Sequence, residues 1–263
     1  MGANDQGAVK MEISEYKNIF ENEKTHFFYV STHNLVVSLI NKWVERKGLA
    51  ILDAGCGTGG LSVKLAALGS VSAIDASPEA IKFARRRGIA AKLASVEKIP
   101  YPSRQFDVVT CIDVIYHKQV KDDVGALSEI RRVLKPGGVL VLRVPANKFL
   151  LSAHDHHVHT ARRYSRNELE KKMKRAGFAV KQISYVHSPI FLVSLVRVIW
   201  ERLTHQVVVS SVGKINPILN MILAVVLKLE AEMITGGTAM PFGQGLIAVA
   251  TPSRQSSLGR KRR

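Results

Sequence analysis

Residues 51–59 read ILDAGCGTG, and this stretch decides the fold of the chain. The apolar run at 50–52 favours a buried strand, and that strand ends at Asp53. Three glycines follow on alternate positions: Gly55, Gly57 and Gly59. Glycines in this pattern allow a tight strand-to-helix turn and let a ligand lie against bare backbone. We therefore expect an α/β domain with a ligand site at this turn.

The charge of Asp53 indicates which ligand this turn receives. A carboxylate at the strand end repels a pyrophosphate and favours a cation, and S-adenosylmethionine carries a sulfonium and an amino group but no phosphate. Gly55, Gly57 and Gly60 also satisfy the dinucleotide pattern G-x-G-x-x-G, with Asp75 near the spacing of a ribose-binding acid. A nicotinamide-dependent oxidoreductase is therefore the alternative, and a glycine turn without a ligand is the third interpretation. Asp53 and the KPGG turn at 135–138 argue against the dinucleotide.

Length and cysteine content favour one intracellular domain. The chain has 263 residues, of which 46% are apolar, enough to bury the core of a single domain covering 1–263. Cys56 falls in the glycine turn and Cys111 in a predicted central strand, so neither is placed for a disulfide. The polar start lacks an apolar signal segment, and we expect residues 1–15 to be disordered. These features predict a cytoplasmic protein.

The net charge of +17 indicates an anionic partner or surface. A basic tail at 252–263 contributes to this charge and is expected to be a solubilising end. The basic residues are dispersed, and no recognition helix or stacking-aromatic motif is visible, so nucleic acid is not the expected partner. An RNA methyltransferase nevertheless stays open as an alternative.

Seven apolar segments are expected to be strands, and helical segments separate most of them. The segments are continuously apolar, which is typical of a parallel sheet with helices on both faces. They cover residues 50–55, 71–76, 91–96, 106–112, 139–144, 179–186 and 245–251. Helix-capping patterns support the division, with Ser77 before Pro78 and Ser165 before Glu168.

A long insertion at 188–241 interrupts this alternation. Its two apolar segments, 189–200 and 217–229, are too short to span a bilayer and favour amphipathic or core-capping helices. They either cover the end of the sheet or form a membrane-docking surface. The second interpretation is supported by nearby basic residues: Arg197, Arg202, Lys214 and Lys228.

Four further motifs accompany the glycine turn in a fixed order. They are IDAS at 74–77, IPYP at 99–102, FDVV at 106–109 and RVLKPGG at 132–138. With these motifs the chain resembles the class I S-adenosylmethionine-dependent methyltransferases, in particular their type 11 group. The resemblance implies a Rossmann-like sheet in the order 3-2-1-4-5-7-6, with strand seven antiparallel. The helical insertion would then lie between strands six and seven.

The same resemblance implies a set of cofactor-binding residues. The turn would hold the methionine end of the cofactor, the acid after the second strand its ribose, and the residues after the third and fourth strands its adenine and the remaining wall. These positions are Asp53, Gly55, Gly57, Gly59, Asp75, Ala76, Ser95, Val96, Asp113 and Val114. Ser95 departs from the pattern, because many relatives carry an aspartate there.

The flanking segments resemble a narrower subgroup within this family. EKTHFF at 23–28, VPA at 144–146, SAHD at 152–155 and PFG at 241–243 carry this resemblance. Members of the subgroup are associated with glycan and isoprenoid-lipid enzymes, which implies a small or lipid-linked acceptor. The sequence predicts neither the acceptor atom nor the oligomeric state.

A histidine-rich loop follows the predicted fifth strand, where the acceptor would approach the methyl group. His154 is the first candidate for a general base, with Asp155 to orient it, and His117 is the second. The loop could equally be a solvated segment or a metal site, although its spacing matches no standard ligand motif. Arg162 and Arg163 either bind an anionic acceptor or are exposed charges before a helix.

Overall fold

The computed structural model describes residues 13–150, 160–204 and 215–253. Its centre is a seven-stranded sheet in the order β3-β2-β1-β4-β5-β7-β6, in which β7 runs antiparallel to both of its neighbours. This topology confirms the predicted one. The strands are β1 (Leu49–Ala54), β2 (Gly69–Asp75), β3 (Ala91–Leu93), β4 (Phe106–Ile112), β5 (Leu134–Pro145), β6 (Phe178–Val186) and β7 (Gly245–Pro252).

Two strands differ from their predicted bounds by three residues or more. β3 ends at Leu93 rather than at 96, because Ser95 instead forms a turn in which its hydroxyl accepts from the Glu97 amide at 3.1 Å. β5 starts at Leu134 rather than at 139, because Leu134 pairs with Phe106 of β4 and so the strand includes the KPGG segment at 135–138. Both differences lie away from the glycine turn.

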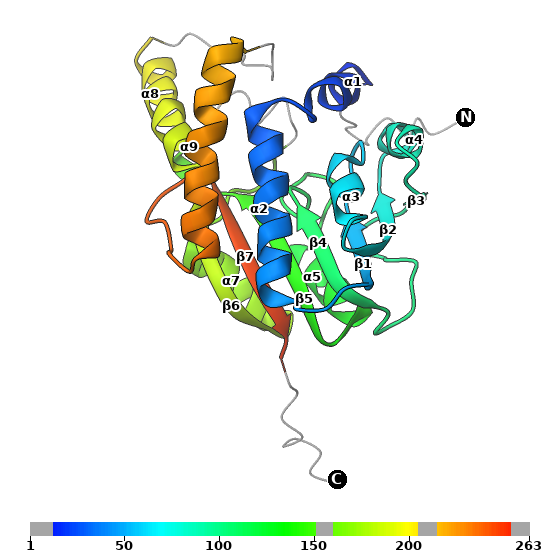
Figure 1. Ribbon diagram of the computed structural model, residues 1–263. Coiled ribbons are helices and arrows are strands. Elements are labelled where there is room, and N and C mark those ends of the chain that lie inside the picture. Colours follow the sequence, from blue (N-terminus) through cyan, green and yellow to red (C-terminus); the bar gives the residue numbers. More distant parts are fainter. Residues whose placement is uncertain (1–12, 151–159, 205–214, 254–263) are drawn as a thin grey trace, which may run out of the picture.

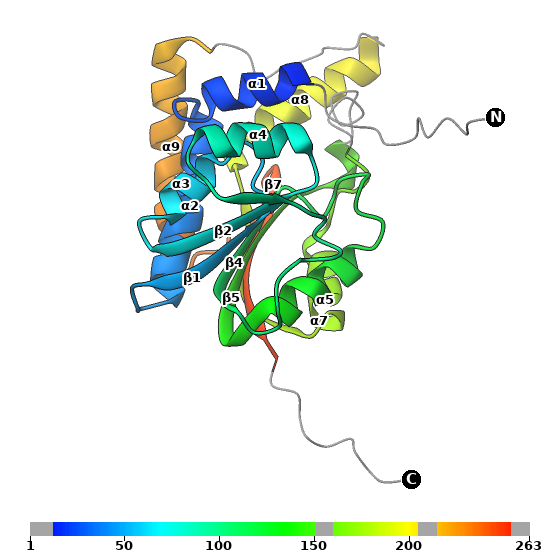
Figure 2. The ribbon, with the colours of Figure 1, turned by 90° about the vertical axis from the view of Figure 1, so that its right-hand side faces the viewer.

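Helices cover both faces of the sheet, as the apolar strands require (Figure 1). α2 (Phe27–Trp43), α3 (Gly60–Leu65) and α9 (Pro217–Thr235) pack on one face, and α5 (Asp123–Val133) and α7 (Arg166–Arg175) pack on the other. α4 (Pro78–Arg86) packs against β2 and β3, and α1 (Ile13–Asn22) lies beside α4 (Figure 2), with the rings of Phe20 and Phe83 5.0 Å apart. The short 3-10 helix η1 (Lys148–Leu150) follows β5.

The first helix starts earlier than expected. α1 begins at Ile13, so the last three residues of the predicted disordered start at 1–15 are helical, and residues 1–12 lie outside the described residues. Apolar and aromatic residues recur at helical spacing in this segment, and Glu15 in the first turn favourably interacts with the helix dipole. α2 starts at Phe27, where His26 is the N-cap and accepts from the Phe28 amide at 3.3 Å.

The insertion forms two helices, as predicted. α8 (Ser188–Thr204) and α9 flank residues 205–214, which lie outside the described residues. α9 runs beside α2 (Figure 1), and Asn220 fastens the two by accepting from the Phe27 amide at 2.9 Å. None of the described helices is long and apolar enough to cross a membrane. Within the predicted tail, Pro252 is still part of β7, and residues 254–263 lie outside the described residues.

Candidate cofactor and acceptor site

A cavity of about 970 Å³ lies at the carboxyl ends of β1, β2, β4 and β5. This is the edge of an open α/β sheet where ligands bind. Residues from the glycine turn, from α1 and from α8 all contribute to its walls. The parallel register brings the ends of the central strands together, since Asp53 of β1 pairs with Ala73 of β2 on one side and with Thr110 of β4 on the other.

The glycine turn leaves bare backbone at the cavity wall. Gly55 and Gly57 both line the cavity and have left-handed φ values of +88° and +53°. A Cβ on Gly55 would overlap the side chain of Val114, which forms the wall opposite. Gly59 has another role: it is the N-cap of α3, and a Cβ there would lie 3.1 Å from Cα of Ala84 in α4. The third glycine therefore serves helix packing.

Asp53 lies at the base of the cavity and is 1% exposed. The hydroxyls of Ser62 and Thr110 donate to its two carboxylate oxygens at 2.6 and 2.8 Å. Burial raises the pKa of this carboxyl to about 6, although both hydroxyl bonds lower it. A buried carboxylate with only neutral donors favours the approach of a cation.

Asp75 lies at the end of β2 with a fixed orientation. Its two carboxylate oxygens accept from the amides of Gly57 and Ser77, each at 2.9 Å. Burial raises its pKa, and these amide bonds oppose the shift. Tyr16 of α1 lines the same wall and is hydrogen-bonded to the Ser77 side chain. Two adjacent ribose hydroxyls fit a carboxylate held in this way.

The remaining predicted cofactor residues also line the cavity. Ala76, Ser95 and Val96 form one part of the wall, and Asp113 forms another with Val114. The Ser95 hydroxyl accepts from the Glu97 amide and so already has a backbone partner. His117 lines the cavity as well, and its Nδ1 accepts from the Gln119 amide at 3.4 Å.

Glu23, directly after α1, contacts the glycine turn. The Thr58 hydroxyl donates to its carboxylate at 2.5 Å, and Arg87 forms an ion pair with it at 2.6 Å. A Cβ on Gly60 would lie within 2.9 Å of both oxygens of this carboxylate, so a larger residue there would displace Glu23. Burial raises the pKa of Glu23, while Thr58 and Arg87 lower it. The sequence linked Glu23 only to a subgroup resemblance, and its contact with the turn is a finding of the structure.

The two arginines after the histidine loop have different surroundings. The guanidinium of Arg162 donates to the carbonyl oxygens of Ile115, Val120 and Lys121 at 2.9 to 3.2 Å, so it anchors the loop after β4. Arg163 lines the cavity, is 8% exposed and donates to the Ala146 carbonyl at 2.9 Å. His154 and Asp155 lie outside the described residues. In the part of the chain that the structure describes, no cluster of His, Cys, Asp and Glu side chains could hold a metal ion.

The sequence analysis did not single out Arg143 and His187. Arg143 lines the cavity from β5, where its buried guanidinium forms an ion pair with Asp113, and His187 follows β6. A signal for Arg143 was present, because VLVLRV at 139–144 places a charge inside an apolar strand. A charge buried in this way requires a partner.

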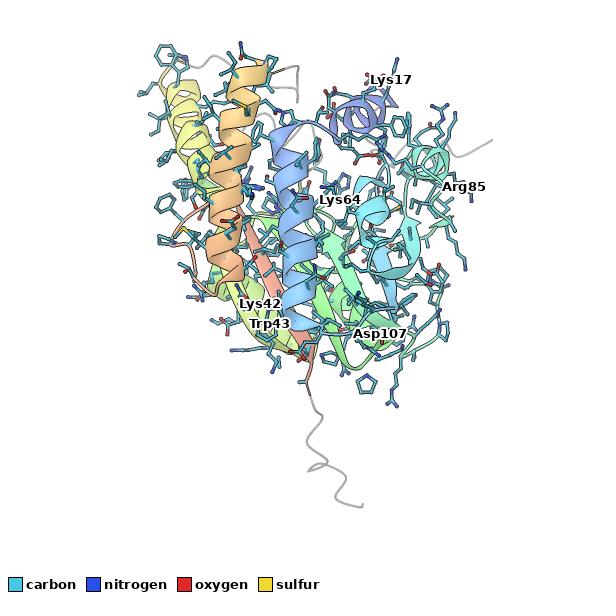
Figure 3. All side chains as sticks on the ribbon, in the orientation of Figure 1. Lys17, Lys42, Trp43, Lys64, Arg85 and Asp107 are labelled. Atoms are coloured by element: carbon cyan, nitrogen blue, oxygen red, sulfur yellow. The ribbon has the colours of Figure 1, made fainter. Side chains whose placement is uncertain are left out.

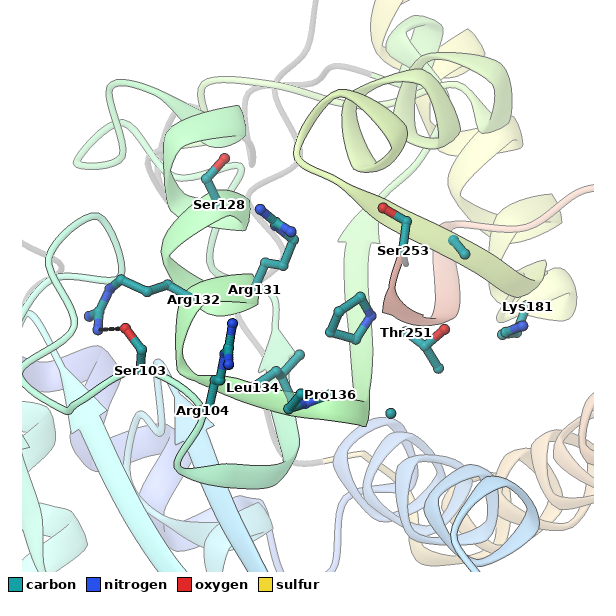
Figure 4. A pocket seen from close by; sticks show the side chains of 13 residues that line it. Ser103, Arg104, Ser128, Arg131, Arg132, Leu134, Pro136, Lys181, Thr251 and Ser253 are labelled. Atoms are coloured by element: carbon teal, nitrogen blue, oxygen red, sulfur yellow. Dashed lines mark hydrogen bonds between the residues drawn. The ribbon is translucent and has the colours of Figure 1, made fainter. Parts of the chain in front are cut away.

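A second groove lies at the opposite edge of the sheet (Figure 4). Its walls carry basic residues and hydroxyls, including Arg104, Arg131 and Lys181. The last turn of α5 contains Arg131 and Arg132, whose charges complement the negative end of the helix dipole. Because this edge presents helix C-termini and none of the glycine turn, it is not the cofactor site.

Comparison with known proteins agrees with the geometry at the first cavity. Residues 52–142 match a family model described as a methyltransferase domain. A ubiquinone biosynthesis O-methyltransferase from Xanthomonas oryzae pv. oryzae is 40% identical over 115 residues, which are 39% of this chain and 47% of that protein. The corresponding protein of Xanthomonas axonopodis pv. citri is 37% identical over the same length. The chain thus spans about half the length of these relatives.

Solved structures show the same fold over most of the chain. A methyltransferase from Thermotoga maritima has a TM-score of 0.58 at 18% identity, covering 92% of this chain and 96% of its own. A phosphoethanolamine N-methyltransferase from Haemonchus contortus, solved with S-adenosylmethionine, has a TM-score of 0.57 at 17% identity, covering 94% and 61%. Residues 52–142 thus match a methyltransferase family model, and the fold around them is the one that these solved methyltransferases share.

Proposed function

We propose that this chain transfers a methyl group from S-adenosylmethionine to an acceptor with an apolar, lipid-like body, at a membrane surface. The observation that carries the proposal is that one helix, α8, both lines the cofactor cavity and exposes apolar side chains on its outer side. The relatives named as ubiquinone biosynthesis O-methyltransferases favour oxygen as the acceptor atom.

The two faces of α8 follow from its spacing. Ile190, Ser194, Arg197 and Val198 line the cavity and recur at intervals of four, three and one residues, which places them on one side of the helix. The other side carries Leu192, Val196, Ile199 and Leu203, which are 48 to 75% exposed. An acceptor held against the inner face would therefore lie one helix diameter from the apolar surface.

α9 extends that apolar surface. Its exposed positions are Ile218, Ile222, Val225, Leu229 and Met233, between 50 and 66% exposed. Figure 3 shows side chains projecting outward from α8 and α9, and α8 with the start of α9 lies at the end of the molecule away from Lys42, Trp43 and Asp107. An apolar surface on a chain of net charge +17 suits an anionic bilayer.

We assign the cofactor to the glycine turn and its neighbours. Asp53 would face the cationic methionine end, Asp75 the ribose hydroxyls, and Ser95 with Val96 the adenine. When bound, S-adenosylmethionine supplies an electrophilic methyl group on a sulfonium with a good leaving group. The protein therefore mainly has to position the acceptor in line and exclude water.

For a hydroxyl acceptor, a nearby base would accept the proton. His117 is the described candidate, since it lines the cavity, and His154 remains the candidate from the loop. His33 also lines the cavity, but burial lowers its pKa to about 3, so its ring would be a weak base.

The charges around the cavity favour a neutral acceptor over an anionic one. Among the described lining residues, the acids are Glu15, Glu23, Asp53, Asp75 and Asp113, and the arginines are Arg143, Arg163 and Arg197. Arg162, which the sequence suggested as an anion ligand, donates to backbone carbonyls instead. An additional anion would therefore enter an already acidic cavity.

Label transfer tests the proposal directly. Purified protein is incubated with methyl-labelled S-adenosylmethionine and a host cell extract, which is then partitioned into organic and aqueous phases. We expect label in the organic phase with the wild type and a strongly reduced amount with Asp53→Asn. Label confined to the aqueous phase would contradict the lipid-like acceptor and would assign α8 and α9 a structural role.

A further inference from the structure

A buried chain of polar groups runs from α9 of the insertion to the rim of the cofactor cavity. It consists of Glu230, His187, Arg143 and Asp113, which come from four different elements or their ends. Resting on the proposed function, we propose that Arg143 and His187 are positioning residues that fix Asp113 for methyl transfer and tie its position to the seating of α8 and α9.

The first member of this series of polar groups, at the cavity, has an unusual backbone conformation. Asp113, directly after β4, has a left-handed φ of +57°, which is costly for a residue with a side chain. Arg143 holds it twice: its carbonyl accepts from the Asp113 amide at 3.0 Å, and its Nη1 forms an ion pair with Oδ2 of Asp113. The Asp113 side chain is 29% exposed and lines the cavity, so this fixed carboxylate can reach a ligand.

Arg143 is enclosed on every side that the structure describes. Its side chain is 5% exposed, and its guanidinium lies 5.0 Å from the ring centroid of Phe28. Gly245 leaves space for it, since a Cβ there would lie 3.1 Å from Nη2. A guanidinium packed this closely has little room to move, so we expect a displacement of one of its partners to reach the other.

His187 forms the next link, and its tautomer follows from its neighbours. Nη2 of Arg143 lies 3.1 Å from Nδ1 of His187, and a guanidinium can only donate, so Nδ1 must accept. The proton is then on Nε2, which lies 3.3 Å from the Thr32 hydroxyl, and that hydroxyl donates to the Phe28 carbonyl at 2.7 Å. Burial and the charge of Arg143 hold the pKa of His187 well below its usual value, which agrees with a neutral ring.

Glu230 connects this link to the insertion. Its two carboxylate oxygens accept from the amides of His187 and Ser188, each at 2.8 Å, and Ser188 is the first residue of α8. His187 itself has a left-handed φ of +59°. One carboxylate of α9 thus sets the start of α8 and the backbone of His187 together. A shift of the two helices would therefore reach Asp113 through His187 and Arg143.

Three variants of the full chain test this coupling. Glu230→Gln replaces one accepting oxygen with a donor, while Arg143→Lys keeps the charge but replaces the two nitrogens that face Asp113 and His187 with a single one. Glu232→Gln is the matched control on the same helix, since its carboxylate is exposed and lies 3.9 Å from Lys228. We expect Glu230→Gln, which does not line the cavity, to bind S-adenosylmethionine within about threefold of wild type, because β1 and β2 hold the cofactor. Label transfer to the lipid fraction should fall at least about tenfold, as expected for a displaced reacting geometry.

A second readout does not depend on methyl transfer. In the wild type labelled with nitrogen-15 at histidine, the resonances assigned to His187 should show a neutral ring protonated on Nε2. This preference should weaken in Arg143→Lys, and Glu232→Gln should match wild type in both assays. A His187 ring protonated on Nδ1, or a tautomer and transfer rate unchanged in Arg143→Lys and Glu230→Gln, would overturn the coupling. Absence of label transfer with wild type would instead refute the proposed function, and the tautomer would still decide the geometry.

Discussion

Asp53→Asn is expected to weaken S-adenosylmethionine binding at least about tenfold, which corresponds to about 1.4 kcal/mol. The amide keeps the shape of the side chain and can still bond to Ser62 and Thr110, whose hydroxyls are able to rotate. The variant therefore removes the charge that faces the cationic end of the cofactor and little else. Isothermal calorimetry measures the change, and circular dichroism checks that the fold is kept. An unchanged dissociation constant would remove Asp53 from the site.

The pH dependence of the same residue gives the prediction a second, independent readout. The folded pKa of Asp53 is raised to about 6 from a reference of 3.8, so the folded state binds the proton more tightly than the unfolded state. The contribution of Asp53 to the free energy of unfolding should therefore fall by about 3 kcal/mol as the pH rises from 4 to above 6, measured as the difference between wild type and Asp53→Asn. Cofactor affinity should rise over this range as the carboxylate ionises, and the part of both dependences that comes from Asp53 should be absent in Asp53→Asn.

The double variant Val196→Glu, Leu203→Glu is expected to lower binding to anionic vesicles by about a hundredfold. These side chains are 68 and 75% exposed on the outer face of α8, and each would lose about 1.5 kcal/mol of apolar burial in the bilayer, before the charge penalty. Co-sedimentation with vesicles rich in phosphatidylglycerol measures the effect. Val63→Glu is the control, because Val63 is an exposed apolar residue on α3, away from the insertion.

Two outcomes would contradict the membrane surface. Wild-type protein that stays in the supernatant with both phosphatidylglycerol and phosphatidylcholine vesicles would exclude docking. Equal loss of binding in the double variant and in Val63→Glu would show that apolar exposure in general, not the α8–α9 face, determines binding. Cofactor affinity should be unchanged in both variants, since none of the three positions lines the cavity.

The sequence predicted the sheet well because its strands are continuously apolar and its turns carry glycine. The strand order and the antiparallel β7 agree with the resemblance drawn from the motifs, and β4 matches its predicted bounds of 106–112. The predicted cofactor residues meet at one cavity, except that Gly59 packs against α4. Local signals were sufficient to predict these residues, because Asp53 and Asp75 each lie at the carboxyl end of an apolar strand.

The remaining features depend on contacts between distant segments. Nothing in the local sequence around His187 or Glu230 shows that they meet, since 43 residues separate them and their bonds form only when α9 packs beside β6. The role of Arg162 could not be predicted locally, because the three backbone carbonyls that accept from it lie more than forty residues before it in the sequence.

Equilibrium titration of the wild-type chain with S-adenosylmethionine, in parallel with NADH, tests the central claim most directly. Asp53 disfavours a pyrophosphate and favours a cation, so we expect saturable binding of S-adenosylmethionine at one site per chain and no measurable binding of NADH. Selective binding of NADH, with no heat from S-adenosylmethionine, would contradict the assignment and support a nicotinamide-dependent oxidoreductase.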